Sequence, residues 1–285
     1  MELTNIRDIQ ELLGRNGFRF SKSMGQNFLT ARWVPERIAE EAGLDEDTGV
    51  LEVGPGIGCL TEQLSMRAGR VLAVEVDKAL RPVLAETLAG RDNVEILFGD
   101  VMKTDLNALV QEHFSGLRPV VCANLPYNIT SPLLTAFLEA GCFETVTVMI
   151  QREVAQRLCA RAGSGEYGAF TVFVNWHAEP EMLFDVSPGC FIPQPKVTSS
   201  VIRLRRRGAP PAEVRDERFF FRVVRAAFNQ RRKTLANALA NGMSEVTREM
   251  AESAVAGCGF DPRIRGEALD IQAFAAVANA IMERI

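Results

Sequence analysis

Short apolar runs alternate with helical patterns between about residue 48 and residue 204, and this alternation constrains the fold more than any other feature of the chain. Helical patterns include residues 60–67, 78–88 and 132–140. The predicted strands are residues 50–53, 71–75, 94–98, 120–124, 146–150, 170–176 and 199–204. The first five are almost continuously apolar, as expected for strands covered on both faces. The pattern predicts an α/β fold with a doubly wound, mostly parallel, seven-stranded sheet, whose last two strands form an antiparallel hairpin at one edge.

The sequence changes character after residue 204. Residues 205–211 combine three arginines with Gly208 and the tandem prolines Pro210 and Pro211, which predicts a linker. Only helical patterns follow, over residues 217–241, 245–257 and 271–284, with Gly242 and Gly257 placed as helix stops. We therefore predict a larger domain over residues 1–208 and a small all-helical domain over residues 209–285.

Composition argues against several classes of protein. No apolar run approaches the roughly 18 residues of a membrane span, and the N-terminus lacks the basic and apolar segments of a signal peptide. The six cysteines form no C-x-x-C pair, which favours free thiols in a reducing compartment over a zinc site or disulfides. With only two histidines in the chain, we expect no metal centre.

Basic residues are concentrated in two segments although the formal net charge is −4. Residues 203–233 carry eleven Lys and Arg against three acids. Residues 12–35 add Arg15, Arg19, Lys22 and Arg32 without an acid. Two basic segments on an acidic chain indicate a localised contact with a polyanion. The alternative for each segment is an ordinary solvated helix face.

Three successive predicted strands end in residues suited to an adenosine ligand. The first runs into Gly54-Pro55-Gly56-Ile57-Gly58, a glycine turn that lets backbone approach a ligand. The second ends at Glu75, 21 positions after Gly54, where an acid can accept hydrogen bonds from ribose hydroxyls. The third ends at Asp100, which can accept from an adenine amino group. The glycine turn alone is shared by nicotinamide and S-adenosylmethionine enzymes.

The fourth strand ends in the most specific motif, Asn124-Leu125-Pro126-Tyr127-Asn128-Ile129. The exocyclic nitrogen of adenine is a poor nucleophile because its lone pair is delocalised into the ring. Two acceptors, the Asn124 side-chain oxygen and the Leu125 carbonyl, could hold its N–H groups, while Pro126 fixes the backbone. Tyr127 offers a ring to stack on an extruded base. The motif predicts catalysis by positioning and electrostatics, against the alternative of an ordinary Asn-x-Pro turn.

Nearly the whole chain resembles the small-subunit (16S) ribosomal RNA adenine N6,N6-dimethyltransferases. The motifs that carry the resemblance are Gly25-Gln26-Asn27-Phe28-Leu29, Leu51-Glu52-Val53-Gly54-Pro55-Gly56, Asn124-Leu125-Pro126-Tyr127-Asn128-Ile129, Phe191-Ile192-Pro193-Gln194-Pro195-Lys196-Val197 and Phe228-Asn229-Gln230-Arg231-Arg232-Lys233-Thr234. The last two are typical of rRNA dimethyltransferases rather than of methyltransferases in general.

The resemblance implies a site for S-adenosyl-L-methionine in residues 1–208 and RNA binding in residues 209–285. The implied cofactor-binding residues are Asn27, Leu29, Gly54, Gly56, Glu75, Asp100 and Asn124. The implied catalytic residues are Asn124, Leu125, Pro126, Tyr127 and Phe191, with Tyr127 and Phe191 as a pair that stacks on the target base. Arg231, Arg232 and Lys233 are expected to grip RNA phosphates.

The function implied is dimethylation of N6 on two adjacent adenines near the 3′ end of small-subunit rRNA, together with a role in ribosome assembly. We expect a monomeric cytoplasmic enzyme that binds the small ribosomal subunit or its precursor, without membrane or metal. The alternatives are a large-subunit rRNA enzyme of the macrolide-resistance type, a DNA adenine methyltransferase, a mainly non-catalytic rRNA-binding assembly factor and a nicotinamide-dependent dehydrogenase.

Overall fold

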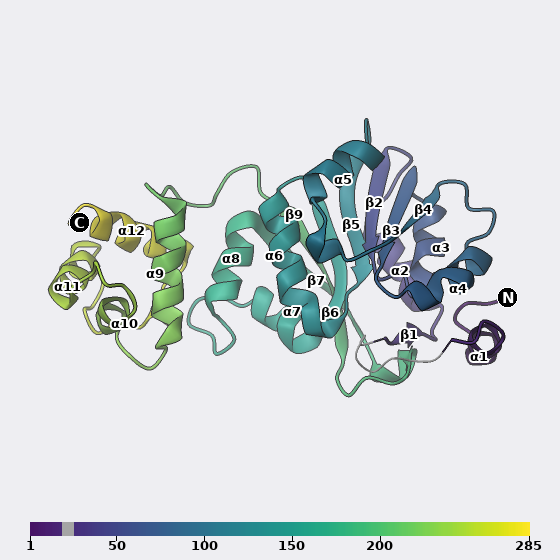
Figure 1. The fold of residues 1–285 in the computed structure, drawn as a ribbon. Coiled ribbons are helices and arrows are strands. Elements are labelled where there is room, and N and C mark those ends of the chain that lie inside the picture. Colours follow the sequence, from purple (N-terminus) through teal and green to yellow (C-terminus); the bar gives the residue numbers. More distant parts are fainter. Residues whose placement is uncertain (19–25) are drawn as a thin grey trace. The chain divides into compact units, whose positions relative to one another are not determined.

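The computed structural model describes residues 1–18 and 26–285, and it divides the chain into two compact units (Figure 1). The first unit comprises Met1–Ala155 and Glu179–Arg206, and the second comprises Gln156–Ala178 and Arg207–Ile285. Arg19 and Lys22 of the predicted basic segment, and Gly25 of the first motif, lie outside the described residues. No helix in the described ranges is long and apolar enough to cross a membrane.

A seven-stranded sheet forms the centre of the first unit. Its strand order is β4 (Val94–Phe98), β3 (Arg70–Glu75), β2 (Thr48–Val53), β5 (Arg118–Asn124), β6 (Thr145–Gln151), β9 (Ser199–Arg206) and β7 (Ala178–Val186). The pairs from β4 to β6 are parallel, and β9 runs antiparallel to β6. The doubly wound, mostly parallel sheet is therefore confirmed. The strand order reverses between β2 and β5, which opens a crevice at the carboxyl ends of these strands.

Helices cover both faces of this sheet (Figure 1). On one face, α2 (Trp33–Glu41) and α3 (Cys59–Ser65) pack on the central strands through a core that includes Ile38, Leu64 and Val71. A second cluster joins α1 (Ile6–Arg15) to α4 (Arg81–Thr87). The opposite face carries α5 (Leu106–His113) and α6 (Thr130–Ala140), and α7 (Arg152–Leu158) follows β6. This double cover explains why the central strands are apolar on both sides.

A small second sheet joins two of the sequence motifs. Its strands are β1 (Phe28–Leu29) and β8 (Phe191–Ile192), which pair antiparallel with Leu29 opposite Phe191. The backbone N–H of Thr30 also donates to the Cys190 carbonyl at 2.8 Å. Segments 160 residues apart in sequence are thus held side by side near the crevice.

The prediction of a strand over residues 170–176 is wrong, because these residues form α8 (Ala169–His177). Val172 and Trp176 lie one helical turn apart and are buried in the core of the second unit, where Trp176 stacks on Phe220 with ring centroids 4.5 Å apart. A short apolar run does not by itself distinguish a buried strand from a buried helix. The missing strand is β7, which lies outside β9, so β9 is an interior strand.

The helical unit also differs from its predicted boundaries, because residues 156–178 group with residues 207–285. The predicted helix over residues 217–241 is two helices, α9 (Glu217–Asn229) and α10 (Leu235–Gly242). Thr234 caps the second by accepting from the N–H of Asn237. The remaining helices are α11 (Arg248–Gly257) and α12 (Ile271–Met282). The stops at Gly242 and Gly257 are confirmed, and a Cβ on Gly242 would lie 2.9 Å from Ala226 on α9.

Candidate active site

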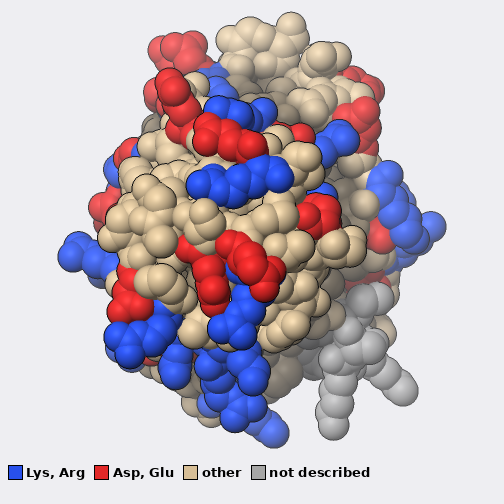
Figure 2. All heavy atoms as spheres, turned by 90° about the vertical axis from the view of Figure 1, so that its left-hand side faces the viewer, with Lys and Arg blue, Asp and Glu red and all other residues tan. Residues whose placement is uncertain are grey.

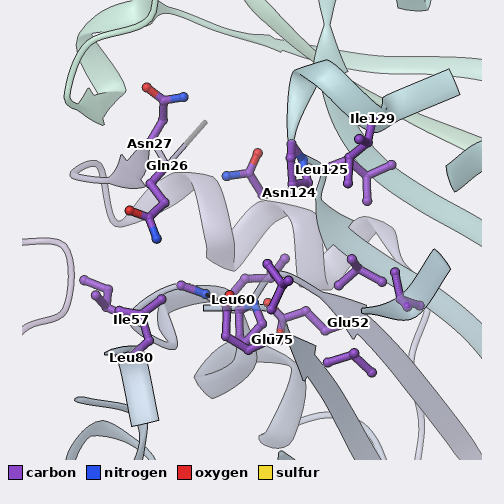
Figure 3. A pocket seen from close by; sticks show the side chains of 18 of the residues that line it. Gln26, Asn27, Glu52, Ile57, Leu60, Glu75, Leu80, Asn124, Leu125 and Ile129 are labelled. Atoms are coloured by element: carbon purple, nitrogen blue, oxygen red, sulfur yellow. Dashed lines mark hydrogen bonds between the residues drawn. The ribbon is translucent and has the colours of Figure 1, made fainter. Parts of the chain in front are cut away.

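A cavity of about 330 Å³ lies at the carboxyl ends of β2, β3 and β5 in the first unit (Figure 3). All seven predicted cofactor-binding residues line it: Asn27, Leu29, Gly54, Gly56, Glu75, Asp100 and Asn124. Leu125, Pro126 and Tyr127 line it as well. The structure therefore brings the glycine turn, the two acids and the fourth-strand motif to one cavity. They meet there because parallel strands end at the same edge of the sheet.

The glycine turn depends on backbone conformations that side chains disfavour. Gly54 and Gly56 have φ values of 72° and 60°, in the left-handed region. A Cβ added to Gly54 would meet no described heavy atom within 4 Å, whereas one on Gly56 would lie 3.2 Å from the Phe28 ring. The turn thus keeps open space beside Gly54 and a close approach of Phe28 to Gly56.

Glu75 and Asp100 are held by backbone donors at the ends of their strands. Glu75 is 4% exposed, and its two carboxylate oxygens accept from the N–H groups of Asp77 at 2.8 Å and Gly56 at 3.3 Å. Burial raises the pKa of the Glu75 carboxyl. Asp100 accepts from the N–H of Met102 at 3.0 Å, with the Lys103 ammonium 3.6 Å from its other oxygen. Each carboxylate oxygen can accept a further hydrogen bond from a ligand.

Glu52 is a third acid of the cavity, and no role was predicted for it from the sequence. It lies within β2, is 1% exposed, and lines the cavity close to Glu75 (Figure 3). Its Oε2 has no hydrogen-bond partner among the described residues, and burial raises the pKa of the carboxyl to about 8. The sequence feature that could have identified Glu52 is an acid inside an apolar strand. A buried polar group normally has a hydrogen-bond partner, so an acid at such a position suggests a ligand.

The fourth-strand motif presents polar atoms to the same cavity. The Asn124 amide extends from the end of β5 into the open space that Gln26 and Asn27 border from another side (Figure 3). The Leu125 N–H donates to the Met149 carbonyl at 3.1 Å, whereas no described residue donates to the Leu125 carbonyl. The two predicted acceptors for an amine therefore belong to adjacent residues that both line the cavity.

Tyr127 and Phe191 do not line one cavity as a pair. Tyr127 begins η4 (Tyr127–Ile129), is half-buried, and its hydroxyl lies 2.6 Å from the Ser199 hydroxyl. Phe191 is 4% exposed and packs in the core cluster that contains Leu29, its partner across the small sheet. It is absent from the residues that line the cavity among those the structure describes. The pairing of β1 with β8 turns the Phe191 ring into the core.

The predicted RNA-binding residues lie in the second unit, in the loop between α9 and α10. Arg231 donates to the Gly165 carbonyl at 3.0 Å and to the Glu267 carboxylate at 3.2 Å. Arg232 and Lys233 are exposed, and neither side chain makes a hydrogen bond or ion pair with the described part of the chain. Figure 2 shows Lys and Arg side chains gathered toward the lower part of one face. Arg232 and Lys233 are therefore unpaired within the described residues, whereas the Arg231 side chain, 41% exposed, is already held by two acceptors.

The chain is similar to known proteins along most of its length. The family model of ribosomal RNA adenine dimethylase matches residues 17–260. The ribosomal RNA small subunit methyltransferase A of Geobacillus thermodenitrificans is 47% identical, covering 96% of this chain and 94% of the relative. The protein of the same name from Alkaliphilus oremlandii is 41% identical and covers 99% of both chains.

Two solved structures share the fold. The 23S rRNA methyltransferase ErmE matches with a TM-score of 0.67 and 29% identity, covering 90% of this chain and 99% of its own. A dimethyladenosine transferase from Plasmodium falciparum matches with a TM-score of 0.70 and 23% identity, covering 87% of this chain and 95% of its own. From the family model and the relatives above 40% identity, we conclude that the chain belongs to the ribosomal RNA adenine dimethylase family of methyltransferases.

Proposed function

We propose that this enzyme uses S-adenosylmethionine to dimethylate N6 of two adjacent adenines in a loop near the 3′ end of small-subunit rRNA, and that it acts in ribosome assembly. The observation that carries the proposal is the single cavity that gathers the glycine turn, three acids and the Asn124–Tyr127 motif. The small-subunit substrate is favoured because relatives with that name are 47% and 41% identical, against 29% for the 23S enzyme. A monomer in the cytoplasm is part of the same proposal.

The cavity suits S-adenosylmethionine better than a nicotinamide cofactor. Glu52, Glu75 and Asp100 place three carboxyl groups on its wall. A cationic ligand favours the ionised forms of the buried Glu52 and Glu75, whereas a pyrophosphate opposes them. The unpartnered Oε2 of Glu52 can accept from the ammonium group of the methionine end. Glu75 can accept from the ribose hydroxyls, and Asp100 from the adenine amino group. When bound, S-adenosylmethionine supplies a methyl group on a sulfonium that is open to attack.

The target adenine is positioned by the fourth-strand motif. In this proposal the Asn124 side-chain oxygen and the Leu125 carbonyl accept the two N–H groups of the base, so that the nitrogen lone pair points at the methyl group. Pro126, with φ of −59°, fixes the backbone that presents this carbonyl. An amide is not a base at neutral pH, so the residues orient and stabilise the amine, which loses its proton during or after transfer.

Tyr127 supplies the stacking surface on the cavity wall. We retain Phe191 as the second ring of this pair, which requires its side chain to leave its present packing beside Leu29. A Phe191→Leu variant keeps apolar bulk in the core but removes the ring, and it should accumulate monomethyladenine. Equal loss of both methyl transfers would assign Phe191 to packing alone.

The second unit is proposed to bind RNA through Arg232 and Lys233, while Arg231 holds the loop by its contacts with Gly165 and Glu267.

A methylation assay on isolated ribosomal particles tests which rRNA is the substrate. Purified protein and isotopically labelled S-adenosylmethionine are incubated separately with unmodified small-subunit and large-subunit particles. Label in adenines of small-subunit rRNA alone is expected, whereas label confined to large-subunit rRNA would contradict the proposal.

A further inference from the structure

One hydrogen bond joins the fourth-strand motif to a strand outside it. The Tyr127 hydroxyl lies 2.6 Å from the Oγ of Ser199, which is fully buried and begins β9. None of the roles assigned above uses Ser199. Its hydroxyl touches the tip of the ring that is proposed to stack on the target base.

The backbone of Ser199 is fixed on the sheet. Ser199 is opposite Gln151 in the antiparallel ladder of β6 and β9, and the next N–H, that of Arg152, donates to the Thr198 carbonyl at 3.0 Å. An interior strand of this kind is among the more rigid parts of a protein. The Ser199 hydroxyl is therefore a fixed point against which a side chain can be held.

Tyr127 lacks such support at its own position. It starts a 3-10 helix of three residues, and the bonds that stabilise this turn run from the N–H of Ile129 and the hydroxyl of Thr130 to the Pro126 carbonyl. Those bonds fix the backbone and do not involve the ring, whose orientation is set by its side-chain torsions. The contact with Ser199 is the polar anchor at the far end of the ring.

We propose that Ser199 is a positioning residue, whose hydroxyl holds the Tyr127 ring in the orientation that stacks on adenine, with its largest effect on the second methyl transfer. The inference rests on the proposed function. After the first transfer only one N–H of the amine remains to be held by Asn124 or Leu125. The second transfer must then depend more on stacking to keep the base in line.

Ser200 provides a matched control. It is also fully buried, neighbours Ser199 on β9 and points to the other face, where its hydroxyl donates to Asp185 at 2.6 Å. Ser200→Ala therefore removes a buried hydroxyl from the same strand without touching Tyr127.

The test follows both transfers by mass spectrometry of digested small-subunit rRNA under single-turnover conditions. Ser199→Ala should slow the second transfer about 3- to 10-fold more than the first, as expected for one lost hydrogen bond. Tyr127→Phe should give the same profile, and the double variant should lose no more than either single variant. Ser200→Ala should keep the wild-type product ratio.

A second readout does not depend on activity. The chain has only two tyrosines, so Tyr167→Phe leaves Tyr127 as the single tyrosine for ¹³C NMR. In that background Ser199→Ala should shift the Tyr127 Cζ resonance, and Ser200→Ala should leave it in place. An unchanged Tyr127 resonance, or equal product ratios in the two serine variants, would overturn the role of Ser199. If the wild type still dimethylated the RNA in that case, the proposed function would stand. Absence of methylation by the wild type would instead contradict the proposed function itself.

Discussion

The acidic cavity of the first unit buries its ionisable side chains, whereas the basic loop of the second unit exposes them. Glu52 and Glu75 are 1% and 4% exposed, and one oxygen of Glu52 has no partner among the described residues. Arg232 and Lys233 are exposed on a loop between helices. A buried ionisable group interacts strongly with a ligand and at fixed geometry, whereas an exposed charge contributes small increments that salt screens. Single substitutions should therefore have large effects in the cavity and small ones in the loop.

Asn124→Ala should have the largest effect, because it removes an acceptor from the reacting amine inside the cavity. Loss of one preorganised polar group at a reaction centre lowers turnover by about 10²–10³-fold. RNA affinity should change little. The exposed Asn128 in the same motif is the control, since Asn128→Ala removes an amide that does not line the cavity. Steady-state methylation rates check this, and a near-normal rate for Asn124→Ala would remove it from the catalytic role.

Glu52 should make stability depend on pH. Its pKa in the folded state, about 8, is above the ordinary value of 4.5, so the folded state keeps a proton that the unfolded chain has lost between these values. Stability should therefore fall as pH rises from about 4.5 to about 8, by at most about 1.4 kcal/mol per pH unit. Glu52→Gln should flatten this fall and melt higher than the wild type at pH 8. Parallel Tm curves for the two proteins from pH 5 to pH 8.5 would show that Glu52 does not titrate as inferred.

Glu75→Ala and Asp100→Ala should each weaken cofactor binding by about 1.5–3 kcal/mol, the range for a charge-assisted hydrogen bond. Calorimetric titration with S-adenosylmethionine measures the change. Asp105→Ala is a control, because Asp105 caps α5 and does not line the cavity. Unchanged affinity in both cavity variants would place the cofactor elsewhere.

The parallel half of the sheet could be predicted because its strands are apolar runs packed between helices. Residues suited to ligand binding follow these strands at the carboxyl edge of the sheet. The exceptions have physical causes. Residues 170–176 form a short, mostly apolar run that suits a strand as well as a helix, yet Val172 and Trp176 pack in the helical core. Glu52 lies within the apolar run of residues 50–53, so the pattern predicted a strand and no site residue there. The contact of Arg231 with Glu267 joins residues far apart in sequence, which no local pattern reveals. The burial of Phe191 likewise depends on pairing with Leu29.

Substitutions in the basic loop should have the smallest effect, and it should appear in the salt dependence of RNA affinity. Replacing Arg232 and Lys233 with alanine should reduce the slope of log affinity against log salt by about 0.7 for each single-strand phosphate contact and about 0.9 for each duplex contact. Arg231→Ala should act mainly through stability, because this side chain is already bonded within the unit. Filter binding to small-subunit rRNA at several salt concentrations separates the two. A wild-type slope in the Arg232 and Lys233 variant would make this loop an ordinary solvated surface.

We propose that the acidic cavity and the Asn124 motif together dimethylate adenines of small-subunit rRNA. The most direct measurement is mass-spectrometric mapping of small-subunit rRNA from cells that lack the gene, complemented with the wild type or with Asn124→Ala. We predict N6,N6-dimethyladenosine at two adjacent positions near the 3′ end with the wild type, and unmodified adenine at both with Asn124→Ala. Unmodified adenines with the wild type, or full dimethylation with Asn124→Ala, would contradict the account.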